Sequence, residues 1–244
     1  MSLDTTTHKN ILLKILKDIY GDTSLGHLLG FKGGTAVYFF YNLGRFSVDL
    51  DFDLLDESKE VEVFEKMGKI IDSYGTIKEI RNKRNTLFIL LSYADGEHNI
   101  KIEINKRNFN SDYEIKSHLG ISMLVMRKQD MFAHKLVAMT ERGKSASRDI
   151  FDVWFFLKNN WEINKEIVEK RTKMKFKDYL NKCLKFIQQY PERGILSGMG
   201  ELLDEKQKVW AKTNLKNDVL FLLKLLKDGF KGLFVFLQVV SNLV

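Results

Sequence analysis

The sequence predicts an α+β protein, with a mixed α/β part over residues 1–120 followed by a helical part over residues 121–244. Residues 46–54 alternate strictly between polar and apolar side chains, which is typical of a strand. From about Met123 onward the apolar residues recur mostly at helical spacing. Three further stretches are strand candidates, at residues 76–81, 86–93 and 99–105.

The remaining elements of the first part follow in chain order. Apolar residues at helical spacing predict an amphipathic helix from His8 to Tyr20. A short strand over residues 28–32 is expected to end at Gly33-Gly34, and Thr35 is expected to cap a helix that runs to about Leu43. Another helix is expected from Ser58 to about Ser73. Together with the strands, these helices predict a small sheet flanked by helices.

Composition indicates an intracellular protein. The single cysteine, Cys183, excludes an intrachain disulfide, and a reduced cytoplasmic thiol is the simplest interpretation. The first thirty residues mix charge and polarity, so no secretory signal is expected. Residues 233–244 form an apolar tail that is shorter than the roughly 20 residues of a membrane span. The tail therefore predicts a buried terminal helix or a partner-binding surface, and no membrane span.

The formal net charge of +7 is concentrated in the C-terminal part. Lys and Arg number 23 against 22 Asp and Glu through Asn160, and 16 against 10 from Trp161 onward. A basic part of this kind can attract an anionic partner such as RNA. A lysine-rich helical surface that serves only solubility explains the same pattern.

Asp49 and Asp51 are the strongest candidates for chemistry. Residues two apart on a strand lie about 6.6 Å apart and point the same way, so the two carboxylates repel each other. A pair of Mg²⁺ ions would offset this cost, since Mg²⁺ prefers carboxylate oxygens and substrate phosphates. An edge strand with a solvated acidic face is the structural alternative.

Two neighbouring segments favour the metal interpretation. Gly33, Gly34 and Thr35 lie at a strand-to-helix junction, where backbone N–H groups and the helix dipole favour a phosphate. Glu103 alternates on a later strand and is the expected third metal ligand. Asp53 shares the strand face of the aspartate pair and is the alternative third ligand.

Two blocks of residues carry a family resemblance. Residues 33–36 read Gly-Gly-Thr-Ala and residues 45–52 read Arg-Phe-Ser-Val-Asp-Leu-Asp-Phe, which resembles the signature of DNA polymerase β-like nucleotidyltransferases, most specifically the AbiEii/AbiGii-type toxin branch. Further on, Lys135 and the stretch Arg-Asp-Ile-Phe-Asp at residues 148–152 resemble the second motif of that family. The resemblance covers roughly residues 28–160.

The second block also has a physical interpretation of its own. Lys135 and Arg142 are seven apart on a predicted helix and share a face, while Arg148 and Asp152 form an i,i+4 pair on the next helix. In the functional interpretation Lys135 binds the triphosphate, Asp152 orients Lys135, and Arg148 reaches a phosphate. A salt-bridge network between two helices is the structural alternative.

The resemblance implies a polymerase β-like mixed sheet with helices, followed by a C-terminal helical bundle. It implies nucleotide transfer from an NTP, with Asp49, Asp51, Lys135 and Asp152 as catalytic residues. Asp49, Asp51 and Glu103 would hold two Mg²⁺ ions, for which Mn²⁺ is a substitute. The remaining predicted site residues bind the nucleotide: Gly33, Gly34, Thr35, Arg45, Ser47 and Arg148.

The resemblance further implies the toxin of a toxin–antitoxin pair that acts in abortive infection, with a cognate antitoxin protein as partner and tRNA as the expected acceptor. A small-molecule or protein acceptor is the enzymatic alternative. A catalytically silent relative that binds RNA or protein through its basic half is the alternative from another class.

Overall fold

The computed structural model describes residues 3–229, so the apolar tail singled out in the sequence lies outside the described residues. The chain divides into two compact units, Met1–Arg127 and Lys128–Val244. The boundary expected at residue 120 falls inside a β-hairpin that belongs wholly to the first unit. The first unit therefore extends past that hairpin to Arg127.

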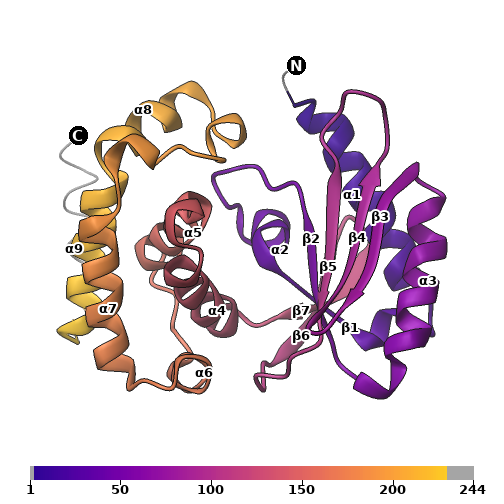
Figure 1. The fold of residues 1–244 in the computed structure, drawn as a ribbon, viewed down its shortest axis with the longest axis horizontal. Coiled ribbons are helices and arrows are strands. Elements are labelled where there is room, and N and C mark those ends of the chain that lie inside the picture. Colours follow the sequence, from indigo (N-terminus) through magenta and orange to yellow (C-terminus); the bar gives the residue numbers. More distant parts are fainter. Residues whose placement is uncertain (1–2, 230–244) are drawn as a thin grey trace. The chain divides into compact units, whose positions relative to one another are not determined.

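The first unit is a seven-stranded mixed sheet with three α-helices (Figure 1). Its strand order is β3-β4-β5-β2-β1-β7-β6. The two pairs β1–β7 and β2–β5 are parallel, and the other neighbours are antiparallel. Its elements are α1 Thr5–Gly21, β1 Leu29–Lys32, α2 Gly33–Tyr41, β2 Leu50–Leu54, α3 Glu60–Asp72, β3 Thr76–Lys83, β4 Thr86–Ser92, β5 Ile100–Asn105, β6 Tyr113–His118 and β7 Ile121–Met126.

The helices of the first unit cover both faces of the sheet. Helices α1 and α3 pack against one face and against each other, and α2 packs on the opposite face beside β1 and β2 (Figure 1). The amphipathic pattern of α1 is the reason for its position, because its apolar stripe is buried while Lys14 and Lys17 are exposed to water. The buried residues of this stripe are Leu12, Ile15, Leu16 and Ile19.

Two details of the first unit correct the sequence-based expectations. Helix α2 begins at Gly33 rather than after Thr35, because Gly33 has φ +79 and turns the chain directly out of β1. The hairpin β6–β7 was not expected, because β7 reads Ile-Ser-Met-Leu-Val-Met and does not alternate. Leu119-Gly120 forms the turn between the two strands, with positive φ at both residues.

The second unit is a bundle of helices, as the sequence predicts (Figure 1). Helix α5 packs between α4 and α9, and α7 packs against α9. Its helices are α4 Lys128–Glu141, α5 Ser147–Lys158, α6 Lys165–Thr172, α7 Phe176–Gln189, α8 Glu205–Thr213 and α9 Leu215–Lys227. Within residues 3–229, no helix combines the length and the apolar character needed to cross a bilayer.

Aromatic rings fill part of this bundle. The rings of Trp154 on α5 and Trp210 on α8 have centroids 4.2 Å apart, and Phe151 packs beside both. At the other end of α5, Phe156 stacks on Trp161 with centroids 4.3 Å apart. These contacts support the prediction that the aromatic residues after Asp152 belong mainly to the core rather than to a stacking platform.

Candidate active site

The junction between β1 and α2 is built around two glycines. A Cβ atom at Gly33 would collide with the carboxylate of Asp51 and would lie 2.9 Å from its Cβ. A Cβ at Gly34 would lie 2.8 Å from the guanidinium Nη2 of Arg45 and 2.8 Å from the hydroxyl of Ser47. Glycine at both positions therefore lets Arg45, Ser47 and Asp51 approach the first turn of α2.

Thr35 has a different role from the expected helix cap. Its buried hydroxyl lies 3.0 Å from Ser47 Oγ and donates to the backbone oxygen of Asp49. These contacts fix the chain before β2 against the first turn of α2. No side chain caps the N-terminus of α2, so its first N–H groups keep the ability to bind an anion.

Arg45 is the least exposed cation of this site, with 3% of its surface accessible. Its Nη1 donates to the backbone oxygen of Phe46 at 2.9 Å, which orders the loop that leads into β2. The guanidinium carries its charge next to Gly34, where the predicted phosphate site lies. Its position is compatible with electrostatic attraction of a phosphate.

The two aspartates lie at the start of β2 and are both half-buried. Asp49 directly precedes the strand, and the ammonium of Lys101 on β5 lies 3.8 Å from its Oδ2. Asp51 stands opposite Glu103 in the parallel register of β2 and β5. The strand pairing therefore brings the predicted third ligand beside the aspartate pair.

Asp53, the alternative third ligand, already accepts hydrogen bonds from three other side chains. Its carboxylate accepts from Lys32 Nζ at 2.5 Å, from Asn105 Nδ2 at 2.7 Å and from the Tyr113 hydroxyl at 2.7 Å. Burial acts to raise the pKa of Asp53, but the ammonium and the neutral donors outweigh burial and hold the pKa below its ordinary value. These contacts favour Glu103 over Asp53 as the third ligand.

The donors at the start of β2 suit a hard divalent cation. Across residues 3–229, no three His, Cys, Asp or Glu side chains are grouped closely enough to hold a metal ion by themselves. Mg²⁺ is usually bound through one or two carboxylates together with substrate phosphates, so it does not need a complete protein cage. The space that Gly33 leaves for the Asp51 carboxylate, next to the open N-terminus of α2, fits this kind of shared site.

The second predicted block forms a compact charge cluster on α4 and α5. The Lys135 ammonium lies 2.8 Å from Asp149 Oδ1 and 2.9 Å from Asp152 Oδ2, and both aspartates are fully buried. Arg142, half-exposed just beyond α4, lies 3.4 Å from Asp149 Oδ2, which is within ion-pair range although that oxygen accepts no hydrogen bond. Arg148 is partly buried in the first turn of α5.

Asp149 pairs with Lys135, although it is not one of the predicted site residues. It is three residues from Asp152, so the two share a helix face toward Lys135. The Arg-Asp-x-x-Asp pattern contained this residue. Its burial and its ion pair with Lys135 could not be read from spacing alone.

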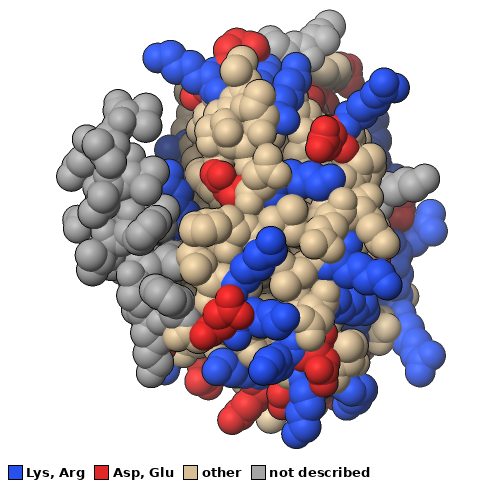
Figure 2. Space-filling view, turned by 90° about the vertical axis from the view of Figure 1, so that its left-hand side faces the viewer, with Lys and Arg blue, Asp and Glu red and all other residues tan. Residues whose placement is uncertain are grey.

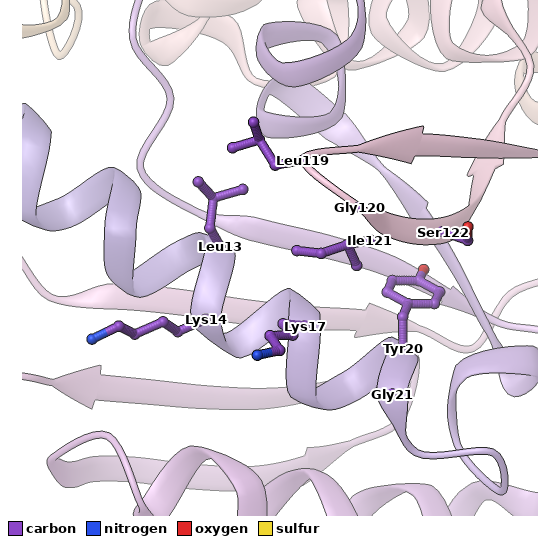
Figure 3. Close-up of a pocket in the computed structure, with 9 residues that line it drawn as sticks. All are labelled: Leu13, Lys14, Lys17, Tyr20, Gly21, Leu119, Gly120, Ile121 and Ser122. Atoms are coloured by element: carbon purple, nitrogen blue, oxygen red, sulfur yellow. The ribbon is translucent and has the colours of Figure 1, made fainter.

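A groove of about 490 Å³ lies elsewhere on the first unit, between α1 and the tip of the β6–β7 hairpin (Figure 3). Lys14 and Lys17 line it from α1, and Leu119 and Ile121 line it from the hairpin. None of its lining residues is acidic or belongs to the predicted site. The groove is therefore separate from the aspartate pair.

Two solved structures share this architecture. JHP933 from Helicobacter pylori aligns with a TM-score of 0.60 at 18% identity, covering 99% of each chain. A protein of H. pylori whose description as a nucleotidyltransferase is provisional aligns with a TM-score of 0.55 at 20% identity, covering 93% of this chain and 99% of that one. These likenesses confirm the fold prediction, a nucleotidyltransferase-like mixed sheet followed by a helical bundle.

The family follows from the sequence itself. The family model of the nucleotidyl transferase AbiEii toxin, type IV toxin–antitoxin system, matches residues 14–219. The chain belongs to this family, as the two residue blocks predicted. A comparison with curated proteins finds no significant match.

Proposed function

We propose that this protein transfers a nucleotide from an NTP to tRNA in a reaction that requires a divalent metal ion. The observation that carries the proposal is the placement of Asp49 and Asp51 beside the uncapped N-terminus of α2, with Gly33 leaving room for the Asp51 carboxylate. Acidic metal ligands and an anion-binding helix terminus are the two features that nucleotidyl transfer needs at one place.

The residues of the first unit have distinct roles in the proposed reaction. The N–H groups at Gly33 and Gly34, with Ser47 and Arg45 beside them, bind and orient the triphosphate. Thr35 positions the segment that carries Asp49. An acceptor hydroxyl attacks the α-phosphorus, a new oxygen–phosphorus bond forms, and pyrophosphate leaves with the electrons of the bond that breaks.

Asp49, Asp51 and Glu103 would hold Mg²⁺, with Mn²⁺ as a substitute. A bound metal ion would neutralise charge on the phosphates and lower the pKa of the acceptor hydroxyl. In the second unit, Lys135, Asp152 and Arg148 keep their predicted catalytic and nucleotide-binding roles. Asp149 joins them as a second carboxylate that orients Lys135.

The choice of tRNA as acceptor rests on charge. Exposed lysines follow the surface of the helical unit, among them Lys177, Lys182 and Lys185 on α7 and Lys224 on α9. Figure 2 views the side of the chain that carries α7, α8 and α9, and Lys and Arg side chains are spread over much of that face with fewer acidic ones between them. A polyanion is a suitable partner for such a surface.

The biological setting follows the family. As a member of a toxin family, the protein is proposed to act with a cognate antitoxin protein. A reaction that uses NTP and tRNA would take place in the cytoplasm, as the sequence predicts.

The test incubates the purified protein with Mg²⁺, total tRNA and each α-labelled NTP in turn. We expect label in tRNA with the wild-type protein and none with Asp49→Ala/Asp51→Ala. The matched control is Asp95→Ala/Glu97→Ala, which removes two carboxylates of the same spacing from the loop between β4 and β5 and should retain transfer. Label that enters protein or a small molecule instead would replace tRNA as acceptor, and transfer that survives without the aspartates would overturn the proposed site.

A further inference from the structure

Lys32 stands directly across the sheet from a proposed metal ligand. The antiparallel register of β1 and β2 pairs Lys32 with Asp51. Directly opposite side chains share a face and have Cβ atoms about 4.5–5.5 Å apart, a gap that a lysine side chain spans easily. An ammonium group and a divalent cation are attracted by the same carboxylate, so Lys32 is a built-in competitor for the metal.

The ion pair that Lys32 forms is with Asp53, its diagonal neighbour. Lys32 Nζ lies 2.5 Å from Asp53 Oδ1, and the two side chains are 20% and 9% exposed. Because the pair is largely withdrawn from water, it is screened much less than a surface ion pair. The ammonium is therefore held toward residue 53.

Asp53 is held by hydrogen-bond donors from strands on either side of β2 in the sheet. Asn105 stands opposite Asp53 on β5 and donates its amide to Oδ1 at 2.7 Å. Tyr113, at the start of β6, donates its hydroxyl to Oδ2 at 2.7 Å. These neutral donors hold the carboxylate in the orientation that receives Lys32.

The absence of a side chain at Gly30 lets Tyr113 reach the carboxylate of Asp53. Gly30 pairs with Asp53 in the β1–β2 register, and β6 lies two strands beyond β1 in the sheet. A Cβ atom at Gly30 would collide with the Tyr113 ring and would lie 2.7 Å from its Cζ. The glycine, the tyrosine and the aspartate therefore form one arrangement that serves the Lys32 ion pair.

We infer that Asp53 is a positioning residue, which draws the Lys32 ammonium away from Asp51 and thereby preserves Asp51 as a ligand for a divalent metal ion. The inference rests on the proposed metal-dependent function. With a neutral side chain at position 53, the ammonium turns to the carboxylate directly opposite and competes with the metal. Removing Lys32 as well removes the competitor.

The test titrates Mn²⁺ alone into the full-length protein by calorimetry, without nucleotide or acceptor. We expect Asp53→Asn to raise the Kd for Mn²⁺ by about 10- to 100-fold, the usual effect of losing an outer-shell partner of a metal site. The double variant Lys32→Met/Asp53→Asn should restore a Kd close to that of the wild type. Circular dichroism of each variant checks that the fold is retained.

Tyr113→Phe is the matched comparison, because it removes a neutral donor from the same carboxylate without changing the charge of that carboxylate. Its Kd for Mn²⁺ should rise much less than that of Asp53→Asn, because Asp53 keeps its ion pair with Lys32. If Asp53→Asn does not fold, Lys32→Met alone decides: Mn²⁺ should bind at least as tightly as in the wild type, since the competing cation is gone.

The outcomes separate this inference from the proposed function. An unchanged Kd in Asp53→Asn, a double variant as weak as the single one, or weaker binding in Lys32→Met would overturn the role of Asp53 alone. Wild-type protein that binds no Mn²⁺, either alone or together with an NTP analogue that cannot be cleaved, would overturn both the inference and the metal dependence. Mn²⁺ binding with the expected pattern, but no transfer to any acceptor, would support the inference and count against the proposed reaction.

Discussion

Gly33 contributes to the site through its backbone and through the side chain it lacks. Its φ of +79 is a conformation that residues with a Cβ rarely adopt, and it lets α2 start directly at the end of β1. The space above its Cα is taken by the Asp51 carboxylate. Backbone turn and carboxylate placement therefore depend on the same residue.

Gly33→Ala tests this dependence, and Gly120→Ala is its matched control. Gly120 has the same φ of +79 but nothing within 4 Å of an added Cβ. Both variants should lose about 1–2 kcal/mol of unfolding free energy from backbone strain, measured by urea denaturation. Only Gly33→Ala should also lose nucleotide transfer, since only its methyl displaces Asp51. Equal activity in the two variants would contradict this role.

The placements that could be predicted are those of residues whose signal is local. Asp49, Asp51 and the glycine pair appear within twenty residues, and strand alternation shows directly which side chains share a face. The hydrogen bonding of Asp53 involves Tyr113, which is sixty residues away in the sequence and three strands away in the sheet. Asp149 pairs with a lysine on another helix. Neither contact can be predicted from the spacing of polar and apolar residues in its own segment.

At the scale of elements, α4 and α5 are joined by a charge cluster with little contact with water. Lys135 on α4 is 16% exposed, while Asp149 and Asp152 on α5 are fully buried. Two buried carboxylates without a cation would be costly, because each needs a partner to offset its lost hydration. Lys135 therefore has a structural role in addition to its proposed role in catalysis.

Lys135→Met should destabilise the protein by about 3–5 kcal/mol, because it removes the ammonium group that both buried carboxylates share. The triple variant Lys135→Met/Asp149→Asn/Asp152→Asn should recover most of that loss, since the neutral amides need no cation. Denaturant unfolding measures both effects. A triple variant as unstable as the single one would show that packing, rather than charge, is lost.

The N-terminal helix is tied to the segment before β2 through His8. Its Nε2 lies 2.9 Å from the backbone oxygen of Val48 and its Nδ1 lies 3.0 Å from the Tyr93 hydroxyl. Burial lowers the pKa of His8 from its ordinary value of 6.5 and outweighs the hydrogen bond to Val48. The folded protein therefore binds this proton less readily than the unfolded chain does.

The sign of the pH effect follows from that difference. The stabilising contribution of neutral His8 is fully present above 6.5 and is lost as the pH falls from there toward the lower folded pKa. His8→Gln can still donate to Val48 but does not titrate. Its unfolding free energy should fall less than that of the wild type between about pH 7.5 and 5.5. Parallel pH profiles would exclude His8 as a source of acid sensitivity.

The elements themselves were predicted unevenly. Strands β2 and β5 could be predicted because polar and apolar residues alternate in them, and β4 because it is a short apolar run bounded by turns. The hairpin β6–β7 was missed, because its exposed Ile115 and Leu119 blur the contrast between a buried and a solvated face. The missed hairpin carries Tyr113, so the network around Asp53 was missed with it.

At the scale of the whole molecule, net charge distinguishes the later part of the chain from the earlier part. The basic excess lies almost entirely after Asn160, on helices of the second unit. Nucleic-acid binding of this kind depends on phosphate contacts and is therefore strongly salt-dependent. The proposed acceptor binding should accordingly depend on the lysines of the second unit.

Lys177→Gln/Lys182→Gln/Lys185→Gln tests this on α7. The slope of the logarithm of the tRNA binding constant against the logarithm of the salt concentration should become shallower by about 2 to 3 units. Lys9→Gln/Lys14→Gln/Lys17→Gln removes the same charge from α1 in the first unit and should leave the slope nearly unchanged. Equal effects from both variants would mean that net charge alone attracts the RNA.

The aromatic cluster of the second unit has a further consequence for spectroscopy. All three tryptophans of the sequence lie after Arg127, and two of them have ring centroids 4.2 Å apart. Intrinsic tryptophan fluorescence is therefore a natural reporter of the helical unit, while the seven-stranded sheet contributes emission from tyrosine only. A fluorescence melting curve would follow the loss of the bundle, and a far-ultraviolet dichroism curve would follow both units. Any gap between the two curves would show directly that sheet and bundle unfold as separate cooperative bodies.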